Sequence, residues 1–133
     1  MGITPGVHDA LTGPLINHLA GALGVPVVGQ PPNPRPPVWV LVERVGGVTG
    51  GRNTDYPMVS VEACAPTKAE ASELAHHAWR LLTRDLPPLI EGVRILRRVP
   101  VSGPSYQPAP SSGDYRYRCT VQIKHHVMKE GPP

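Results

Sequence analysis

The clearest pattern in the chain lies between residues 58 and 84, where an alternation of two changes to helical spacing. Residues 59–63 alternate apolar and polar side chains, which is typical of a half-buried strand. Thr67 and Glu70 then have the spacing of a capping box, and apolar residues recur on one helical face until a Leu-Pro-Pro tripeptide. This stretch predicts one helix packed on one sheet.

The N-terminal region, residues 1–24, predicts a first helical region because leucines recur there every three to four residues. Pro14 lies inside this pattern, where it either kinks the helix or opens a fresh one as its first residue. Gly24 is a suitable residue for the C-terminal stop of this helix.

Four further segments predict strands: 25–29 as a short edge strand, 38–45, 93–101 with an irregularity at Arg97, and 115–127. The last is the most regular. Its odd-numbered residues, including Cys119, form an apolar face, and its even-numbered residues, including Arg116 and Lys124, form a basic one.

The connecting segments are rich in Pro and Gly. Residues 30–38 hold five prolines and predict a stiff, extended polyproline spacer; a Pro-rich ligand for an SH3-like partner is the less favoured alternative, since the segment leads directly into a strand. Residues 46–53 predict a flexible hairpin loop and 102–113 a Pro/Ser/Gly loop. Residues 128–133 predict a frayed tail.

Together these elements predict an α+β fold: a mainly antiparallel sheet of four or five strands with two helices packed on one face. The length of 133 residues suits a single domain spanning residues 1–133. The charge of +3 is mildly basic, and no window has the length and hydrophobicity of a membrane span. The sequence has no secretion-signal pattern and only two cysteines, which predicts a reduced, cytosolic protein without membrane contact.

No motif predicts catalysis or a bound group. The Gly-rich loop lacks the Lys-Ser/Thr of a phosphate-binding loop and leads into a strand instead of a helix. Neither His76-His77 nor His125-His126 can chelate a metal alone, because neighbouring side chains point in different directions, and we expect these histidines to lie at the surface. Cys64 and Cys119 lie in predicted strands and suit buried positions better than a nucleophile. We therefore expect no enzyme activity, no cofactor and no metal.

The basic face of the last predicted strand carries more information. Arg116, Arg118 and Lys124 lie on it, and a solvated sheet face is the simplest interpretation for a monomer. Trp39 and Leu41 on a neighbouring strand would make the face both apolar and cationic, which suits a subunit interface.

Four segments carry a resemblance to a known family: residues 31–47, PPNPRPPVWVLVERVGG; 55–75, DYPMVSVEACAPTKAEASELA; 101–108, VSGPSYQP; and 116–123, RYRCTVQI. In this order, across most of the chain, they resemble the tail terminator (tail-completion) proteins of long-tailed phages, especially those infecting actinobacteria.

The resemblance implies an α+β subunit of the virion tail or neck, assembled in the host cytoplasm into a homo-hexameric ring. The ring would cap the tail tube protein, end tube polymerisation and offer its other side to a head-completion or connector protein. Genomic DNA would pass through the lumen and make non-specific phosphate contacts. The family supplies no invariant functional residue. We predict interface or lumen positions at Trp39, Arg44, Arg52, Arg116 and Arg118, with Arg52 placed in a loop that could reach a partner or DNA.

Two other hypotheses are open. A small basic nucleic-acid-binding module would use the Arg/Lys strand, although Tyr115 and Tyr117 lie on the opposite side from its arginines. A histidine-dependent metalloenzyme would need one histidine from each doublet and a third ligand.

Overall fold

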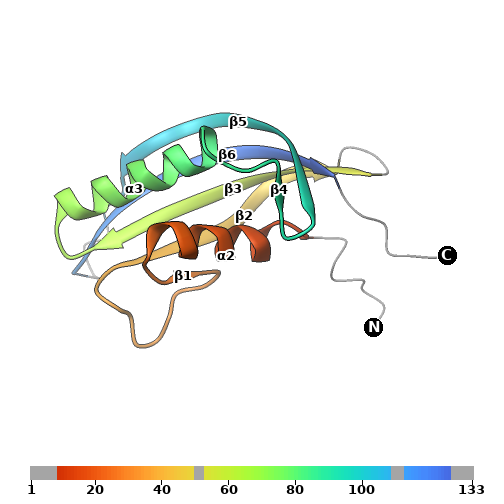
Figure 1. Cartoon of the computed structure of the whole chain (residues 1–133). Coiled ribbons are helices and arrows are strands. Elements are labelled where there is room, and N and C mark those ends of the chain that lie inside the picture. The colour runs from red at the N-terminus through yellow and green to blue at the C-terminus, as the bar shows by residue number, and fades with distance from the viewer. Residues whose placement is uncertain (1–8, 50–52, 109–112, 127–133) are drawn as a thin grey trace.

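The computed structural model describes residues 9–49, 53–108 and 113–126, which form an α+β fold with one curved sheet and two helices (Figure 1). The helices are α2 (Thr12–Leu23) and α3 (Lys68–Thr83); the strands are β1 (Val27–Val28), β2 (Trp39–Thr49), β3 (Thr54–Ala65), β4 (Leu89–Ile90), β5 (Val93–Tyr106) and β6 (Tyr115–His126). They form one six-stranded sheet in the order β1-β2-β3-β6-β5-β4, in which only the β1–β2 pair is parallel.

The predicted strand–turn–helix unit is confirmed as β3 and α3. Thr67 has an extended backbone, and its hydroxyl oxygen accepts a hydrogen bond from the Glu70 N–H at 3.2 Å. The same hydroxyl donates to the Glu70 carboxylate at 2.9 Å, so the two side chains meet directly. This cap satisfies one of the free N–H groups at the start of α3 and sets where the helix begins.

Helix α2 begins at Thr12, inside the predicted N-terminal helical region. The Asp9 carboxylate accepts hydrogen bonds from the N–H and the hydroxyl of Thr12, at 3.2 and 2.8 Å. Pro14 lies in the first turn, although not at the first helical residue, and there its missing N–H removes no helical hydrogen bond. Gly24 ends α2 in the left-handed conformation (φ 71°) and donates its N–H to the Ala20 carbonyl, as predicted.

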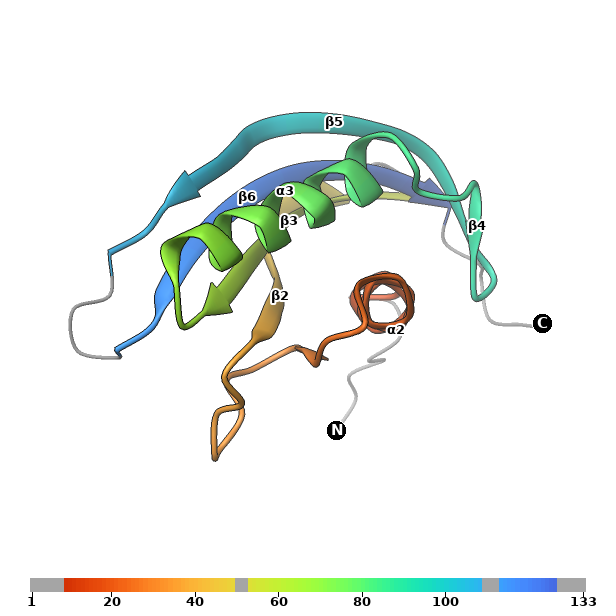
Figure 2. The ribbon, with the colours of Figure 1, turned by 60° about the vertical axis from the view of Figure 1, so that its left-hand side comes forward.

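Both helices lie on the concave side of the sheet (Figure 2), and the main core lies between them and the strands. Helix α2 contributes Leu15 and Leu19 to this core, and Leu11, directly before the helix, packs with them. Helix α3 contributes Ala75, Ala78 and Leu82. The central strands contribute Val40, Val42, Val59, Val61, Val121 and Ile123. All of these side chains are buried, which confirms the apolar faces predicted for α3 and for the three central strands.

Three expectations about the sheet need correction. It has six strands because β4, which was not predicted, pairs with the start of β5. The predicted loop 46–53 is shorter, since β2 continues to Thr49 after a register shift between Arg44 and Gly46. The predicted loop 102–113 is also shorter, since β5 continues to Tyr106 through three register shifts. Bulges let a strand continue where simple alternation fails. The first shift in β5 includes the irregularity predicted at Arg97.

The proline-rich segment connects β1 to its parallel neighbour β2. Val28, at the end of β1, pairs with Leu41, close to the start of β2. Because the two strands are parallel, the chain must return from the end of β1 to the end of the sheet at which both strands begin. The segment therefore folds back on itself, and the expected extended spacer is wrong (Figure 1). The predicted tail at 128–133 lies outside the described residues.

Candidate interaction face on the helix-free side of the sheet

The face of the sheet opposite the helices carries two cross-strand rows that include most of the predicted interface residues. One row runs from Trp39 through Cys64 to Arg116 across β2, β3 and β6. The next runs from Leu41 through Glu62 to Arg118. The predicted combination of apolar and cationic side chains on one face is therefore present, but β2 and β6 are not the neighbours that we expected, because β3 lies between them.

Trp39 is buried within the subunit. Its side chain is 0% exposed and packs with Leu41 and Cys64. The Arg35 and Arg116 guanidinium carbons lie 5.9 and 5.8 Å from the ring centroid, so one cation contacts it from the proline-rich segment and one from β6. Trp39 thus holds the proline-rich segment to the sheet, and its predicted role in an interface stays a prediction.

Glu62 neutralises much of the basic character of the central part of this face. Its side chain is 7% exposed, and its two oxygens lie 3.4 Å from Arg116 Nη1 and 3.3 Å from Arg118 Nη2. Arg116 also contacts Asp114 at 3.3 Å. Arg118, half of which is exposed, is the more accessible of the two arginines. The predicted basic face is therefore an ion-pair network over its first half.

Arg44 lies on the other side of the sheet, close to the start of α2. Its guanidinium donates two hydrogen bonds to Asp55, at 2.7 and 3.1 Å. Burial raises the pKa of Asp55, but the hydrogen bonds and charge of Arg44 outweigh burial and the net pKa lies below its ordinary value. The pair joins β2 to β3 beside the bulge, so its evident role is structural. Arg52 lies outside the described residues.

The residues considered for catalysis or metal binding are held apart or buried. Burial raises the pKa of the Cys64 and Cys119 thiols to about 12, so neither is activated as a nucleophile. His125 is fully buried; its Nδ1 lies 3.2 Å from the His126 carbonyl and its Nε2 lies 3.8 Å from Asp55. Within the described residues, no three His, Cys, Asp or Glu side chains form a group that could hold a metal ion.

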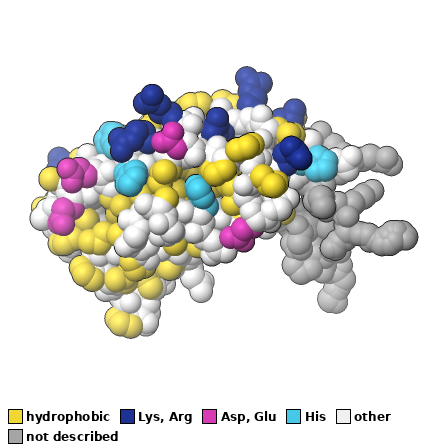
Figure 3. Space-filling model, viewed as in Figure 1, with side chains coloured by type: hydrophobic (Ala, Val, Ile, Leu, Met, Phe, Trp, Pro, Cys, Tyr) yellow, Lys and Arg dark blue, Asp and Glu magenta, His cyan; other side chains and the backbone are white. Residues whose placement is uncertain are grey.

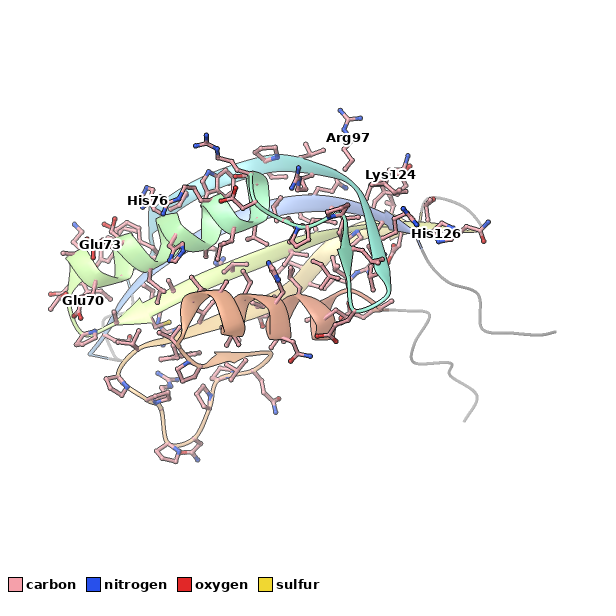
Figure 4. All side chains as sticks on the ribbon, in the orientation of Figure 1. Glu70, Glu73, His76, Arg97, Lys124 and His126 are labelled. Atoms are coloured by element: carbon pink, nitrogen blue, oxygen red, sulfur yellow. The ribbon has the colours of Figure 1, made fainter. Side chains whose placement is uncertain are left out.

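A second basic region, which we call the cationic corner, lies where β5 begins and β6 ends. It consists of Arg94, Arg97, Lys124 and His126. Arg97 lies directly across from Lys124, and both Arg94 and Arg97 are exposed. Figure 4 shows Arg97, Lys124 and His126 near one end of the molecule, and Glu70 and Glu73 at the other. Lys and Arg side chains follow the upper edge of the same view in Figure 3.

Sequence reasoning found only half of this corner. The alternation along 115–127 placed Lys124 and His126 on the basic face, but Arg97 was noted only as an irregularity. The register shift between Ile95 and Arg97 is what brings Arg97 opposite Lys124. A bulge of this kind reverses the side to which the following residues point, and the basic Arg94-Ile-Leu-Arg-Arg98 run was the available signal.

In comparisons with known proteins, the chain matches no protein-family model and no curated protein sequence. Neither of the two described helices has the length and apolar character needed to cross a membrane.

Proposed function

We propose that the protein is a structural subunit of a phage tail, which assembles into a homo-hexameric ring that caps the tail tube and ends its polymerisation. The described elements are a helix, a short strand, a hairpin, a second helix and three strands, and this α+β fold agrees with the subunit that the resemblance implies. The opposite side of the ring offers a surface to the head-completion or connector protein, and genomic DNA passes through the lumen.

The observation that carries the proposal is the state of the two sheet edges. Strand β1 pairs only with Val40 and Leu41 of β2, and β4 pairs only with Val93 and Arg94 of β5. Along most of their length, β2 and β5 therefore have no strand paired on their outer side within the described part of the chain. Because the two edges differ, contact between them would be heterologous, and heterologous contacts close into a ring when the rotation permits.

Exposed apolar side chains lie on both open edges, as such a contact needs. Val45 and Val48 on β2 are 53% and 64% exposed, and Leu96 and Val101 on β5 are 45% and 49% exposed. Two prolines and three register shifts interrupt β5, which makes continuous backbone pairing along it unfavourable. We therefore expect neighbouring subunits to meet through side chains more than through an added strand.

The competing candidate is a small basic nucleic-acid-binding module that functions alone. It was based on Arg116, Arg118 and Lys124, of which the two arginines are engaged by Glu62. Nucleic-acid binding by a lone subunit would therefore depend on Lys124 and its neighbours. Assembly state separates the two candidates, since the module requires neither a ring nor a tube.

The test is native mass spectrometry of the purified chain, alone and with the tail tube protein encoded beside it, together with a tube-growth assay. A six-fold species, or a stoichiometric cap on tubes that then stop growing, supports the proposal. A Val48→Glu/Val101→Glu variant should fold but fail to assemble, whereas Leu89→Glu, at an exposed site on β4, should behave as the parent. A strict monomer that ignores the tube protein refutes the proposal.

A further inference from the structure

The four basic residues of the cationic corner share the helix-free face of the sheet. Arg97 and Lys124 form a direct cross-strand pair, and His126 lies two residues beyond Lys124 on the same side of β6. Arg94 precedes Ile95, which faces the core with its partner His125, so Arg94 lies on the opposite, helix-free side. Side chains of directly opposed residues start about 5 Å apart.

We propose that the cationic corner is a binding site for the phosphate backbone of double-stranded DNA. Like charges placed directly opposite each other destabilise a sheet, and Arg97 and Lys124 are placed in that way. The Lys124 ammonium lies 5.3 Å from the centre of the Tyr56 ring, which offsets part of this cost. An anion held between the two cations would remove the repulsion.

The acidic side chains described on this face are distant from the corner. Glu43 lies on β2, two strands away from β6, and is level with Thr120, which is four residues, or about 13 Å, along β6 from Lys124. The buried carboxylate of Glu62 is engaged by Arg118, which lies six residues along β6 from Lys124. At the rise of a strand this is about 20 Å. That separation exceeds the screening length of about 8 Å at physiological salt, so the corner retains its positive field.

The composition of the corner suits phosphate more than a protein partner. Arginine and lysine form charge-assisted hydrogen bonds with phosphate oxygens, and such contacts position DNA without reading its sequence. The cores of protein–protein interfaces are instead depleted in charged residues, whereas surfaces that bind DNA are strongly positive. The choice of DNA as the polyanion rests on the proposed function, in which the genome passes through the ring.

The test is fluorescence anisotropy with a labelled 30-base-pair duplex of arbitrary sequence, titrated with full-length protein between 20 and 150 mM KCl. The test variant is Arg97→Gln/Lys124→Gln. The control, Lys68→Gln/Arg80→Gln, loses the same net charge at two exposed positions on α3. The test variant should bind at least about tenfold more weakly at the lowest salt, and its salt slope should fall by about 1.8, since each phosphate contact contributes about 0.9. The control should bind as the parent does.

A third variant separates a loss of DNA binding from a loss of folding. Arg97→Glu would place a carboxylate across from Lys124, so its thermal midpoint should rise or stay the same while DNA binding weakens. Equal losses in the test and control variants would mean that only net charge matters and would overturn the proposal. Absence of binding by the parent at 20 mM salt would also overturn it. Neither result affects ring formation or tube capping, which are measured without DNA.

Discussion

The ion pair between Arg44 and Asp55 offers the sharpest test of the forces that hold the hairpin of β2 and β3. Asp55 Oδ2 and Oδ1 accept hydrogen bonds from Arg44 at 2.7 and 3.1 Å, and Asp55 also accepts one from the Tyr56 N–H at 3.0 Å. The Asp55 side chain is 6% exposed and the Arg44 side chain 22% exposed. Replacing Asp55 by Asn keeps the shape but removes the charge that Arg44 contacts.

The expected cost of Asp55→Asn follows from this burial. Breaking a fully buried ion pair costs about 3–5 kcal/mol, but water reaches part of Arg44 and screens the loss. A net hydrogen bond to a charged group is worth about 1.5–3 kcal/mol. We therefore expect the free energy of unfolding to fall by about 2 kcal/mol at pH 7. For a chain of this length the thermal midpoint should fall by roughly 8 °C.

The pH dependence gives an independent check. The pKa of Asp55 in the folded protein lies below its ordinary value of 3.8, so the carboxylate stabilises the fold above that value. This contribution disappears as the pH falls through 3.8 toward the folded pKa. The difference between parent and Asp55→Asn should therefore be full at pH 7 and shrink at pH 3.

The assay is urea unfolding followed by circular dichroism at pH 7, 5 and 3, with Arg118→Gln as a control. Arg118 is about half exposed, so its loss should cost less than about 1 kcal/mol at any of these pH values. The reasoning is refuted if Asp55→Asn is as stable as the parent at pH 7. It is also refuted if the stability difference is undiminished at pH 3.

Substitutions at three further positions test local features of the backbone by thermal unfolding. Gly21→Ala, in the interior of α2 with nothing within 4 Å of an added Cβ, should stabilise by roughly 0.5–1 kcal/mol; a lower midpoint would contradict this. Thr67→Ala should cost about 1 kcal/mol because it removes the cap of α3, and Thr67→Ser should retain most of that stability; equal losses would argue against capping. Gly47→Ala should cost at least about 2 kcal/mol, since Gly47 has φ +111° and its Cβ would meet the Tyr56 carbonyl; a neutral effect would show that the hairpin adjusts freely.

The elements that the sequence predicted best are those whose signals are local. Helix α3 has its cap, its apolar face and its stop within twenty residues, and it forms as expected between Lys68 and Thr83. Strand β6 alternates without interruption, and Cys119, Val121 and Ile123 are buried as the pattern predicted. His125, which was expected at the surface, is buried with them. In both cases one period describes the whole element.

The predictions failed where the period changes inside an element. Strand β2 passes through a bulge at Gly46, and β5 shifts register three times, so simple alternation ends each strand too early. Strand β4 has only two residues and exists because it pairs with the start of β5. Such a short strand has no pattern of its own.

Of the predicted interface or lumen residues, the sequence by itself placed Trp39, Arg116 and Arg118 on one face, because strand alternation is a local property. Only the tertiary structure decided that Trp39 is enclosed, that Glu62 engages both arginines and that Arg97 stands opposite Lys124. These facts depend on which strands are neighbours and in which register. Partners of that kind come from residues more than twenty positions apart, so the charge that remains available on the surface is set by the fold.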